Sequence, residues 1–295
     1  MGERTGPFFE PRKSVLTEET IRAFCRQLDP ERHRMLRYLS RDEIYDNGKG
    51  MAPGGLLLAE MLAEQLSLKT GDRVLDAGCG RGLSSVFLAS RYKARVVSVD
   101  LWIGVQERQR RAAGAGVGDL ITPLQGDIGR GVPIDSGSFD AIFCMQSFHC
   151  FGTRPWLLRY LASLLKPGGR LGIAQGCFRH EVKAFPPLFM DTGGWHAEYE
   201  KYHSPGWWRN HFLSCQNLEV TLAREVPDGD ILWEDDVLYR CERQGWSAEY
   251  LGYSAWLIRQ IVHGRKATPA LTHCMVVATK RDHAIGRVPC LSANA

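Results

Sequence analysis

Apolar and polar residues along this chain follow two spacings, one typical of buried strands and the other typical of helices. Short apolar runs bounded by glycine or charge predict strands, and apolar residues three and four apart predict helices. Strands are expected at 73–77, 95–100, 121–124, 141–145, 170–175, 218–222 and 273–280. Helices are expected within 17–39 and at 54–66, 82–92, 103–114, 154–165, 231–241 and 248–262. The alternation predicts an α/β fold with a doubly wound, mostly parallel sheet covered by helices on both faces.

The first predicted strand runs into a glycine-rich loop. Asp76 is followed by Gly78, Gly80 and Gly82, and Asp100 closes the next apolar run. Glycine allows a tight turn and a close approach of a ligand to the main chain. This order is that of a nucleotide-type cofactor site at the mouth of a parallel sheet. An acid two positions before the first glycine would repel a pyrophosphate, but it suits a ligand that carries an ammonium group.

The loop resembles motif I of the class I S-adenosylmethionine (SAM) dependent methyltransferases. Later segments resemble the same family in order: Gly126-Asp127-Ile128, 138–143, 164–169 and 273–280. The stretch 43–55 together with Trp102 resembles the small-molecule, cyclopropane-synthase-like branch. The resemblance covers about residues 50–176 and resumes at the last strand. It implies a Rossmann-like, seven-stranded sheet with an antiparallel last strand, SAM as cofactor, S-adenosylhomocysteine as product and no metal.

In that family the glycine loop holds the methionine part of SAM, and the acid that ends the second strand binds the ribose. Tyr45 resembles a tyrosine that lies over the sulfonium, where a ring gains cation–π attraction; a surface loop tyrosine is the alternative. The cofactor residues implied by the resemblance are Tyr45, Asp76, Gly78, Cys79, Gly80, Asp100, Leu101, Trp102, Asp127, Ile128, Met145 and Gln146.

The segment after the fourth predicted strand carries the main candidate for acid–base chemistry. Ligands of open α/β sheets bind at the carboxyl ends of strands, and His149 follows such an end. Its imidazole is suited to act as a general base, and a hydrogen-bonded residue that shapes the pocket is the alternative. His180, after the fifth strand, is the second candidate base.

The chain divides by pattern into four parts. They are a helical cap at 1–50, a SAM-binding core at 51–176, a substrate lid with the sixth strand at 177–272, and the last strand with the tail at 273–295. The lid is rich in aromatic residues, most of which are expected to build its own core. The residues assigned to the substrate pocket are Phe148, Trp195, His196, Tyr199, Trp207 and Trp208.

Composition and charge limit the classes of partner expected for this protein. The net charge is only +4, and lysine and arginine are spread along the chain, so nucleic-acid binding is not expected. The basic cluster 108–111 is interpreted as a solvated helix face. No apolar run approaches the roughly 18 residues of a membrane span, and the nine cysteines form no C-x-x-C pair. A reduced, cytoplasmic protein with no membrane partner is expected, and a homodimer is one option.

The function expected from these features is methyl transfer to an oxygen, nitrogen or sulfur atom of a small soluble molecule by in-line displacement. Two alternatives stay open: a SAM-binding sensor or partner subunit without catalysis, and a methyltransferase that acts on protein or nucleic acid. The glycine spacing disfavours a nicotinamide-dependent oxidoreductase, whose loop follows G-x-G-x-x-G.

Overall fold

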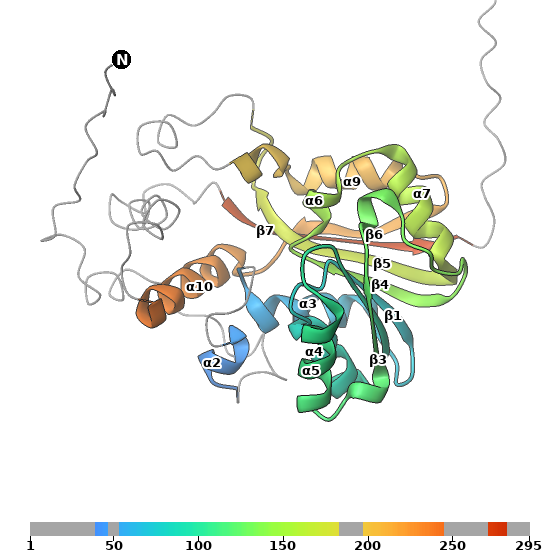
Figure 1. Cartoon of the computed structure of the whole chain (residues 1–295). Helices are drawn as coiled ribbons and strands as arrows, with labels where there is room; N and C mark the ends of the chain where they lie inside the picture. Colours follow the sequence, from blue (N-terminus) through green and yellow to red (C-terminus); the bar gives the residue numbers. More distant parts are fainter. Residues whose placement is uncertain (1–38, 47–52, 183–196, 245–270, 282–295) are drawn as a thin grey trace, which may run out of the picture.

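The computed structural model describes residues 39–46, 53–182, 197–244 and 271–281 (Figure 1). Their strands form one sheet in the order β3-β2-β1-β4-β5-β7-β6, in which β7 is antiparallel to both neighbours. The strands are β1 (Arg73–Ala77), β2 (Arg95–Asp100), β3 (Ile121–Gln125), β4 (Phe139–Met145), β5 (Leu165–Phe178), β6 (Leu218–Glu225) and β7 (Leu271–Lys280). The predicted α/β fold with a mostly parallel seven-stranded sheet is confirmed.

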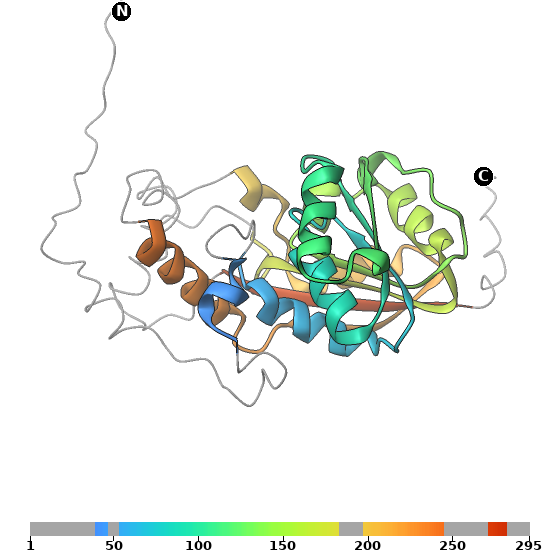
Figure 2. The same ribbon diagram turned by 60° about the horizontal axis from the view of Figure 1, so that its bottom comes forward.

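Helices cover both faces of this sheet (Figures 1 and 2). The α-helices are α2 (Arg41–Ile44), α3 (Gly55–Leu66), α4 (Leu83–Tyr92), α5 (Val105–Gly114), α6 (Phe148–Phe151), α7 (Pro155–Leu164), α9 (Pro205–Leu213) and α10 (Gly229–Gln244). Short 3-10 turns are η3 (Gly118–Leu120), η4 (Ile128–Arg130) and η5 (Ala197–Lys201). One apolar layer joins α3, α4 and α5 to the sheet, and a second joins α6, α7 and α9 to its other face.

The central strands are buried on both faces, which explains their continuous apolar sequences. In β2 every residue after Arg95 is buried, and in β1 every residue after Arg73 is buried. Parallel strands covered by helices on both sides need apolar residues at successive positions, whereas a half-exposed strand alternates. The valine-rich run of β2 is therefore the sequence signal of a central position in the sheet.

One strand and three helices differ from the expected elements. β5 begins at Leu165, five residues before the predicted start, because Leu165 pairs with Phe139 before the register shifts to the pair Arg170 and Ala141. The helices α2, α6 and α9 were not predicted; at the start of α2, Ser40 and Glu43 form a reciprocal capping box. The predicted helix at 248–262 and nearly all of 17–39 lie outside the described residues.

The sheet order reverses beside β1. The chain passes from β1 outward to β2 and β3, and it then crosses to β4 on the other side of β1. At such a switch point the connections after neighbouring strands leave in opposite directions, and a crevice opens at their carboxyl ends. The fold therefore places the loop after β1 and the segment after β4 at the same crevice.

Gly169 lies in the first part of β5, where backbone carbonyl groups leave no room for a larger residue. A Cβ atom there would lie 2.9 Å from the Lys166 carbonyl oxygen and 3.1 Å from those of Phe139 and Asp140. We expect Gly169→Ala to lower the free energy of unfolding by about 1–3 kcal/mol, because backbone must move to admit the methyl group. Chemical denaturation measures the change.

Gly114→Ala is the matched control, since a Cβ atom at Gly114 meets no atom within 4 Å. This variant should be neutral or slightly stabilising, because alanine favours a helix over glycine. Equal unfolding free energies for the two variants would contradict the packing argument.

Candidate functional site

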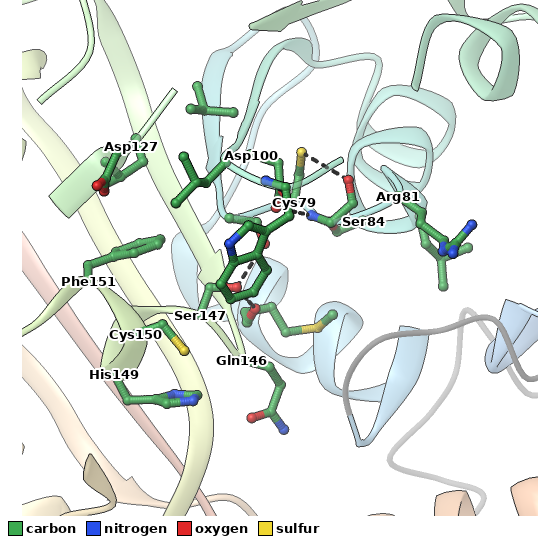
Figure 3. Close-up of a pocket in the computed structure, with 18 of the residues that line it drawn as sticks. Cys79, Arg81, Ser84, Asp100, Asp127, Gln146, Ser147, His149, Cys150 and Phe151 are labelled. Carbon is green, nitrogen blue, oxygen red and sulfur yellow. Dashed lines mark hydrogen bonds between the residues drawn. The ribbon is translucent and has the colours of Figure 1, made fainter. Parts of the chain in front are cut away.

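A pocket of about 270 Å³ opens at the carboxyl ends of β1, β2 and β4, in the crevice at the switch point (Figure 3). Eleven of the residues that the sequence assigned to the site line this pocket. They are Gly78, Cys79, Gly80, Asp100, Leu101, Trp102, Asp127, Ile128, Met145, Gln146 and His149. The fold thus brings together residues from the ends of several strands, as expected for a ligand site in an open α/β sheet.

The glycine loop passes very close to the segment after β4. The N–H groups of Gly78 and Cys79 donate to the carbonyl oxygen of Val99 on β2, at 2.8 and 3.1 Å. Gly78 and Gly80 have φ angles of +73° and +53°, which glycine adopts without strain. A Cβ atom on Gly78 would lie 2.4 Å from the Cβ atom of Ser147. Only glycine at position 78 therefore permits this contact between the two loops.

The Asp100 carboxylate organises the floor of the pocket. One of its oxygens accepts from the Gly80 N–H at 2.8 Å. The other accepts from the N–H groups of Trp102 and Ile103, at 2.8 and 2.9 Å. A carboxylate has about four acceptor positions, so Asp100 keeps capacity for a donor on a ligand in the pocket.

Asp76 lies beneath the glycine loop and does not line the pocket, which corrects its predicted contact with a cofactor. Its side chain is buried, and one carboxylate oxygen accepts from the hydroxyls of Ser84 and Ser85 on α4, at 2.7 and 2.6 Å. Burial raises the pKa of Asp76 to about 6, and the two serine hydroxyls oppose the shift. Asp76 thus anchors the first turn of α4 from inside.

The residue after β4 has a strained backbone. Gln146 has a φ angle of +54°, which is uncommon outside glycine and costs of the order of 1 kcal/mol or more. Its side-chain N–H donates to the Pro53 carbonyl oxygen at 3.0 Å, and its side-chain oxygen accepts from the Gly176 N–H at 2.9 Å. Gln146 therefore ties the segment before α3 to the end of β5, and part of its amide is already engaged by the protein.

His149 lies in α6 at the opposite side of the pocket from Asp100 and is only 5% exposed (Figure 3). Its backbone N–H donates to the side-chain oxygen of Gln175 at 3.1 Å. Its ring meets the Tyr202 ring edge-on, with centroids 5.1 Å apart. The ring is thereby held at the pocket wall.

Phe148 and Trp208 do not line the pocket. Both are fully buried, and their rings meet edge-on with centroids 5.7 Å apart in the layer beneath α6, α7 and α9. In α6 the two neighbours Phe148 and His149 point to different surroundings, one to the core and one to the pocket. Sequence spacing alone did not separate them.

The other aromatic candidates also lie elsewhere. Trp207 stacks between His203 and His211, with ring centroids 3.8 and 5.3 Å away, and Tyr199 is buried against Tyr202. None of these rings except Tyr202 lines the pocket. Trp195 and His196 lie outside the described residues.

Tyr45 and His180 are also outside the pocket lining. The Tyr45 hydroxyl donates to the Asp235 carboxylate of α10 at 2.6 Å, and its ring packs 5.1 Å from the Tyr239 ring. Burial raises the pKa of Tyr45 well above its usual value. Tyr45 thus fixes the end of α2 to α10, and His180 is exposed beyond the end of β5.

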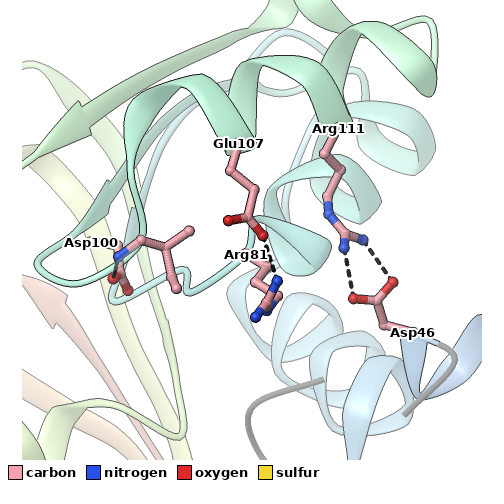
Figure 4. Close-up of polar contacts among 6 residues, drawn as sticks. Asp46, Arg81, Asp100, Glu107 and Arg111 are labelled. Carbon is pink, nitrogen blue, oxygen red and sulfur yellow. Dashed lines mark hydrogen bonds and ion pairs between the residues drawn. The ribbon is translucent and has the colours of Figure 1, made fainter. Parts of the chain in front are cut away.

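Several residues that line the pocket were not predicted from the sequence, and some of them belong to segments distant from the glycine loop. Asp46 pairs with both terminal nitrogens of Arg111 on α5, at 2.9 and 2.7 Å, and Arg81 pairs with Glu107 of the same helix at 2.6 Å (Figure 4). The lining residues not assigned beforehand include Asp46, Pro53, Gly55, Arg81, Ser84, Ser147, Cys150, Phe151 and Tyr202. Ser84, Ser147, Cys150 and Phe151 adjoin recognised segments, whereas no local pattern marks Asp46 or Tyr202.

The described parts of the chain contain no group of three or more histidine, cysteine or acidic side chains placed to hold a metal ion. No helix among them has the length and apolar character needed to span a membrane.

The family described as "Methyltransferase domain" matches residues 74–169. The chain is 28% identical over 204 residues to phosphoethanolamine N-methyltransferase 1 of Arabidopsis thaliana, covering 60% of this chain and 40% of that protein. It is 33% identical over 117 residues to 27-O-demethylrifamycin SV methyltransferase of Amycolatopsis mediterranei (strain S699), covering 39% and 43%. The chain thus spans about four tenths of the length of these relatives.

Solved structures show the same fold. A phosphoethanolamine N-methyltransferase 2 of Haemonchus contortus, in complex with SAM, superposes with a TM-score of 0.61 at 17% identity. The match covers 91% of this chain and 58% of that protein. At this identity the similarity supports the Rossmann-like fold and does not extend to the substrate.

The buried carboxyl of Asp76 makes stability depend on pH. Its pKa rises from 3.8 to about 6 on folding, so between about pH 4 and 6 the folded protein binds more protons than the unfolded chain, and stability falls as pH rises. Asp76→Asn keeps an oxygen for the two serines and removes the titration. We therefore expect the unfolding free energy of the variant minus that of wild type to increase by up to about 3 kcal/mol as pH rises from about 4 to 6.

Denaturant titrations at several pH values between about 4 and 7 measure this gain. Exposed Asp119 provides the control, and the difference between Asp119→Asn and wild type should stay constant. Parallel pH curves for Asp76→Asn and wild type would show that Asp76 titrates normally.

Proposed function

We propose that the protein transfers a methyl group from SAM to a small molecule, starting from the match of residues 74–169 to the family described as "Methyltransferase domain". The observation that carries the proposal is that one pocket joins the glycine loop and Asp100 to His149. The acceptor atom is an oxygen, nitrogen or sulfur. Two curated relatives named as methyltransferases of small molecules support this substrate class.

The cofactor end of the pocket fits SAM on the geometry of its residues. Gly78, Cys79 and Gly80 expose main chain to the pocket, and no side chain would fit at Gly78. The remaining acceptor position of Asp100 suits a ribose hydroxyl. We assign the methionine part to the loop and the ribose to Asp100.

The same assignment places the adenine between two segments at the outer end of the pocket. Leu101 and Trp102 are 48% and 70% exposed, so they offer apolar surface that a base would cover. Asp127 and Ile128 face the pocket from the segment after β3, where a carboxylate can accept from an amino group. Met145 and Gln146 then lie toward the reacting end.

SAM supplies an electrophilic methyl carbon on a sulfonium. When bound, SAM would give this carbon to the lone pair of the acceptor, and its sulfur would keep the electron pair of the broken bond. His149 is placed to take a proton from an acceptor hydroxyl or ammonium. Its low exposure and the edge contact with Tyr202 keep water from the ring and fix its direction.

We assign the acceptor wall to the segment 177–272. Tyr202 is its described member in the pocket lining, and Trp233 of α10 packs behind it with ring centroids 6.1 Å apart. A Cβ atom on Gly176 would lie 2.8 Å from both rings, so glycine at the end of β5 makes room for them. In the same segment, α9 and β6 pack into the core.

A reducing compartment such as the cytoplasm suits this protein. The cysteines whose side chains the structure describes are free thiols, and five of the six are buried; they are Cys79, Cys144, Cys177, Cys215 and Cys274, with Cys150 exposed. Free thiols persist where glutathione and thioredoxin keep them reduced.

Asp100→Ala tests the cofactor end. The variant should weaken SAM binding by about 2–3 kcal/mol, because it removes a charge-assisted contact and the acceptor that holds the loop. Calorimetric titration with SAM, S-adenosylhomocysteine and NADH measures the affinities, and exposed Asp119→Ala should match wild type. Unchanged SAM affinity in Asp100→Ala would refute the ribose assignment, and binding of NADH alone would refute the proposed cofactor.

His149→Gln tests the acceptor end. We expect turnover to fall by about 10²–10⁴, the usual contribution of a general base, while SAM affinity changes little. His180→Gln should match wild type, since His180 is exposed and outside the pocket. Methyl transfer from radiolabelled SAM to a panel of small acceptors gives the rates. Equal rates for both variants would make His149 a structural residue.

A further inference from the structure

α5 carries a buried arginine. Arg108 is 2% exposed and is one of the largest fully enclosed side chains of the described residues. The next basic residue, Arg110, is exposed. This corrects the interpretation of the cluster 108–111 as a solvated face, because Arg108 lies on the inward side of α5 with Ala112 one turn later.

The Arg108 guanidinium joins three backbone segments beneath the pocket. One terminal nitrogen donates to the Ser98 carbonyl oxygen of β2 at 2.5 Å. The other donates to the carbonyl oxygens of Leu124 in β3 and Ile103, at 2.9 and 3.2 Å. Arg108 therefore adds a side-chain link between the neighbouring strands β2 and β3.

The same guanidinium faces the underside of the glycine loop. A terminal nitrogen lies 3.6 Å from the Cys79 sulfur. The charges on Arg108 and Asp100 both act on Asp76, in opposite directions: the guanidinium lowers the pKa of Asp76 and the Asp100 carboxylate raises it. The Arg108 guanidinium and the Asp76 carboxylate thus both lie beneath the glycine loop.

Burial of this cation needs compensation. An isolated guanidinium in the interior is costly, and a buried charge persists when it is paired and hydrogen-bonded. Arg108 obtains its hydrogen bonds from carbonyl oxygens of β2, β3 and Ile103, and its charge lowers the pKa of Asp76. One of these partners also supports the pocket, since Ile103 donates its N–H to Asp100, which lines the pocket.

We propose that Arg108 is a positioning residue for the cofactor site, which holds the Cys79 turn and the segment after Asp100 in the binding geometry. This inference rests on the proposed SAM binding. Both the forked shape and the charge of the guanidinium are required: the fork spans two strands, and the charge strengthens its hydrogen bonds to their carbonyl oxygens.

Two conservative variants separate shape from charge. Arg108→Lys keeps the charge and loses the fork, and Arg108→Gln keeps two N–H donors and loses the charge. Arg110→Gln, on the exposed side of the same helix, is the matched control. SAM and S-adenosylhomocysteine are titrated calorimetrically into each protein after its melting curve has been recorded.

We expect the dissociation constants of both ligands to rise at least fivefold in Arg108→Lys and in Arg108→Gln, with Arg110→Gln equal to wild type. A purely structural role would lower the melting temperature and the binding stoichiometry, but it would leave the dissociation constant of the folded fraction unchanged. A rise of less than fivefold in either Arg108 variant overturns the proposal. Absence of SAM binding in wild type would instead refute the proposed function.

Discussion

The pocket depends on one buried carboxylate, Asp100, which accepts three hydrogen bonds from backbone N–H groups on both sides of it. The Gly80 N–H reaches it from the loop after β1, and those of Trp102 and Ile103 reach it from the segment after β2. Three hydrogen bonds to one charged group are stronger than bonds between neutral groups. These hydrogen bonds fix the two loops that follow the carboxyl ends of β1 and β2. The shape of the cofactor end of the pocket depends on the positions of these loops.

A second constraint is steric and links this loop to the reacting end. Gly78 and Ser147 approach so closely that a methyl group on Gly78 would overlap the serine, and the Ser147 hydroxyl donates to the Gly78 carbonyl oxygen at 2.8 Å. The next residue toward β4, Gln146, holds a positive φ angle while its amide joins Pro53 to Gly176. Strain of this kind persists where surrounding contacts determine the backbone. These contacts fix the glycine loop, the segment between β4 and α6, and the segment before α3 relative to one another.

Sequence patterns predicted the parts of the structure that arise from local order. The apolar runs of β1 and β2, the glycines between them and the position of Asp100 are all encoded within about thirty residues, and the structure places them together. Patterns could not tell the inward side of α5 from its outward side, because Arg108 occupies a position where an apolar residue is the usual signal. They also could not assign Phe148 and Trp208 to the core, since aromatic residues serve cores and pockets equally. Tyr202 reaches the pocket only through tertiary packing.

The two ends of the pocket therefore have different origins. The cofactor end is built by hydrogen bonds among neighbouring strand ends, and a change there would disturb the sheet itself. The acceptor end combines His149 of α6 with Tyr202, which stands on a long connection between β5 and β6, and with Pro53 and Gly55 at the start of α3. Side chains of such distant segments can be substituted without altering the backbone at the carboxyl ends of β1, β2 and β4. A fold of this design can keep one cofactor geometry while its acceptor wall varies, and a substrate is then selected by the wall and not by the sheet.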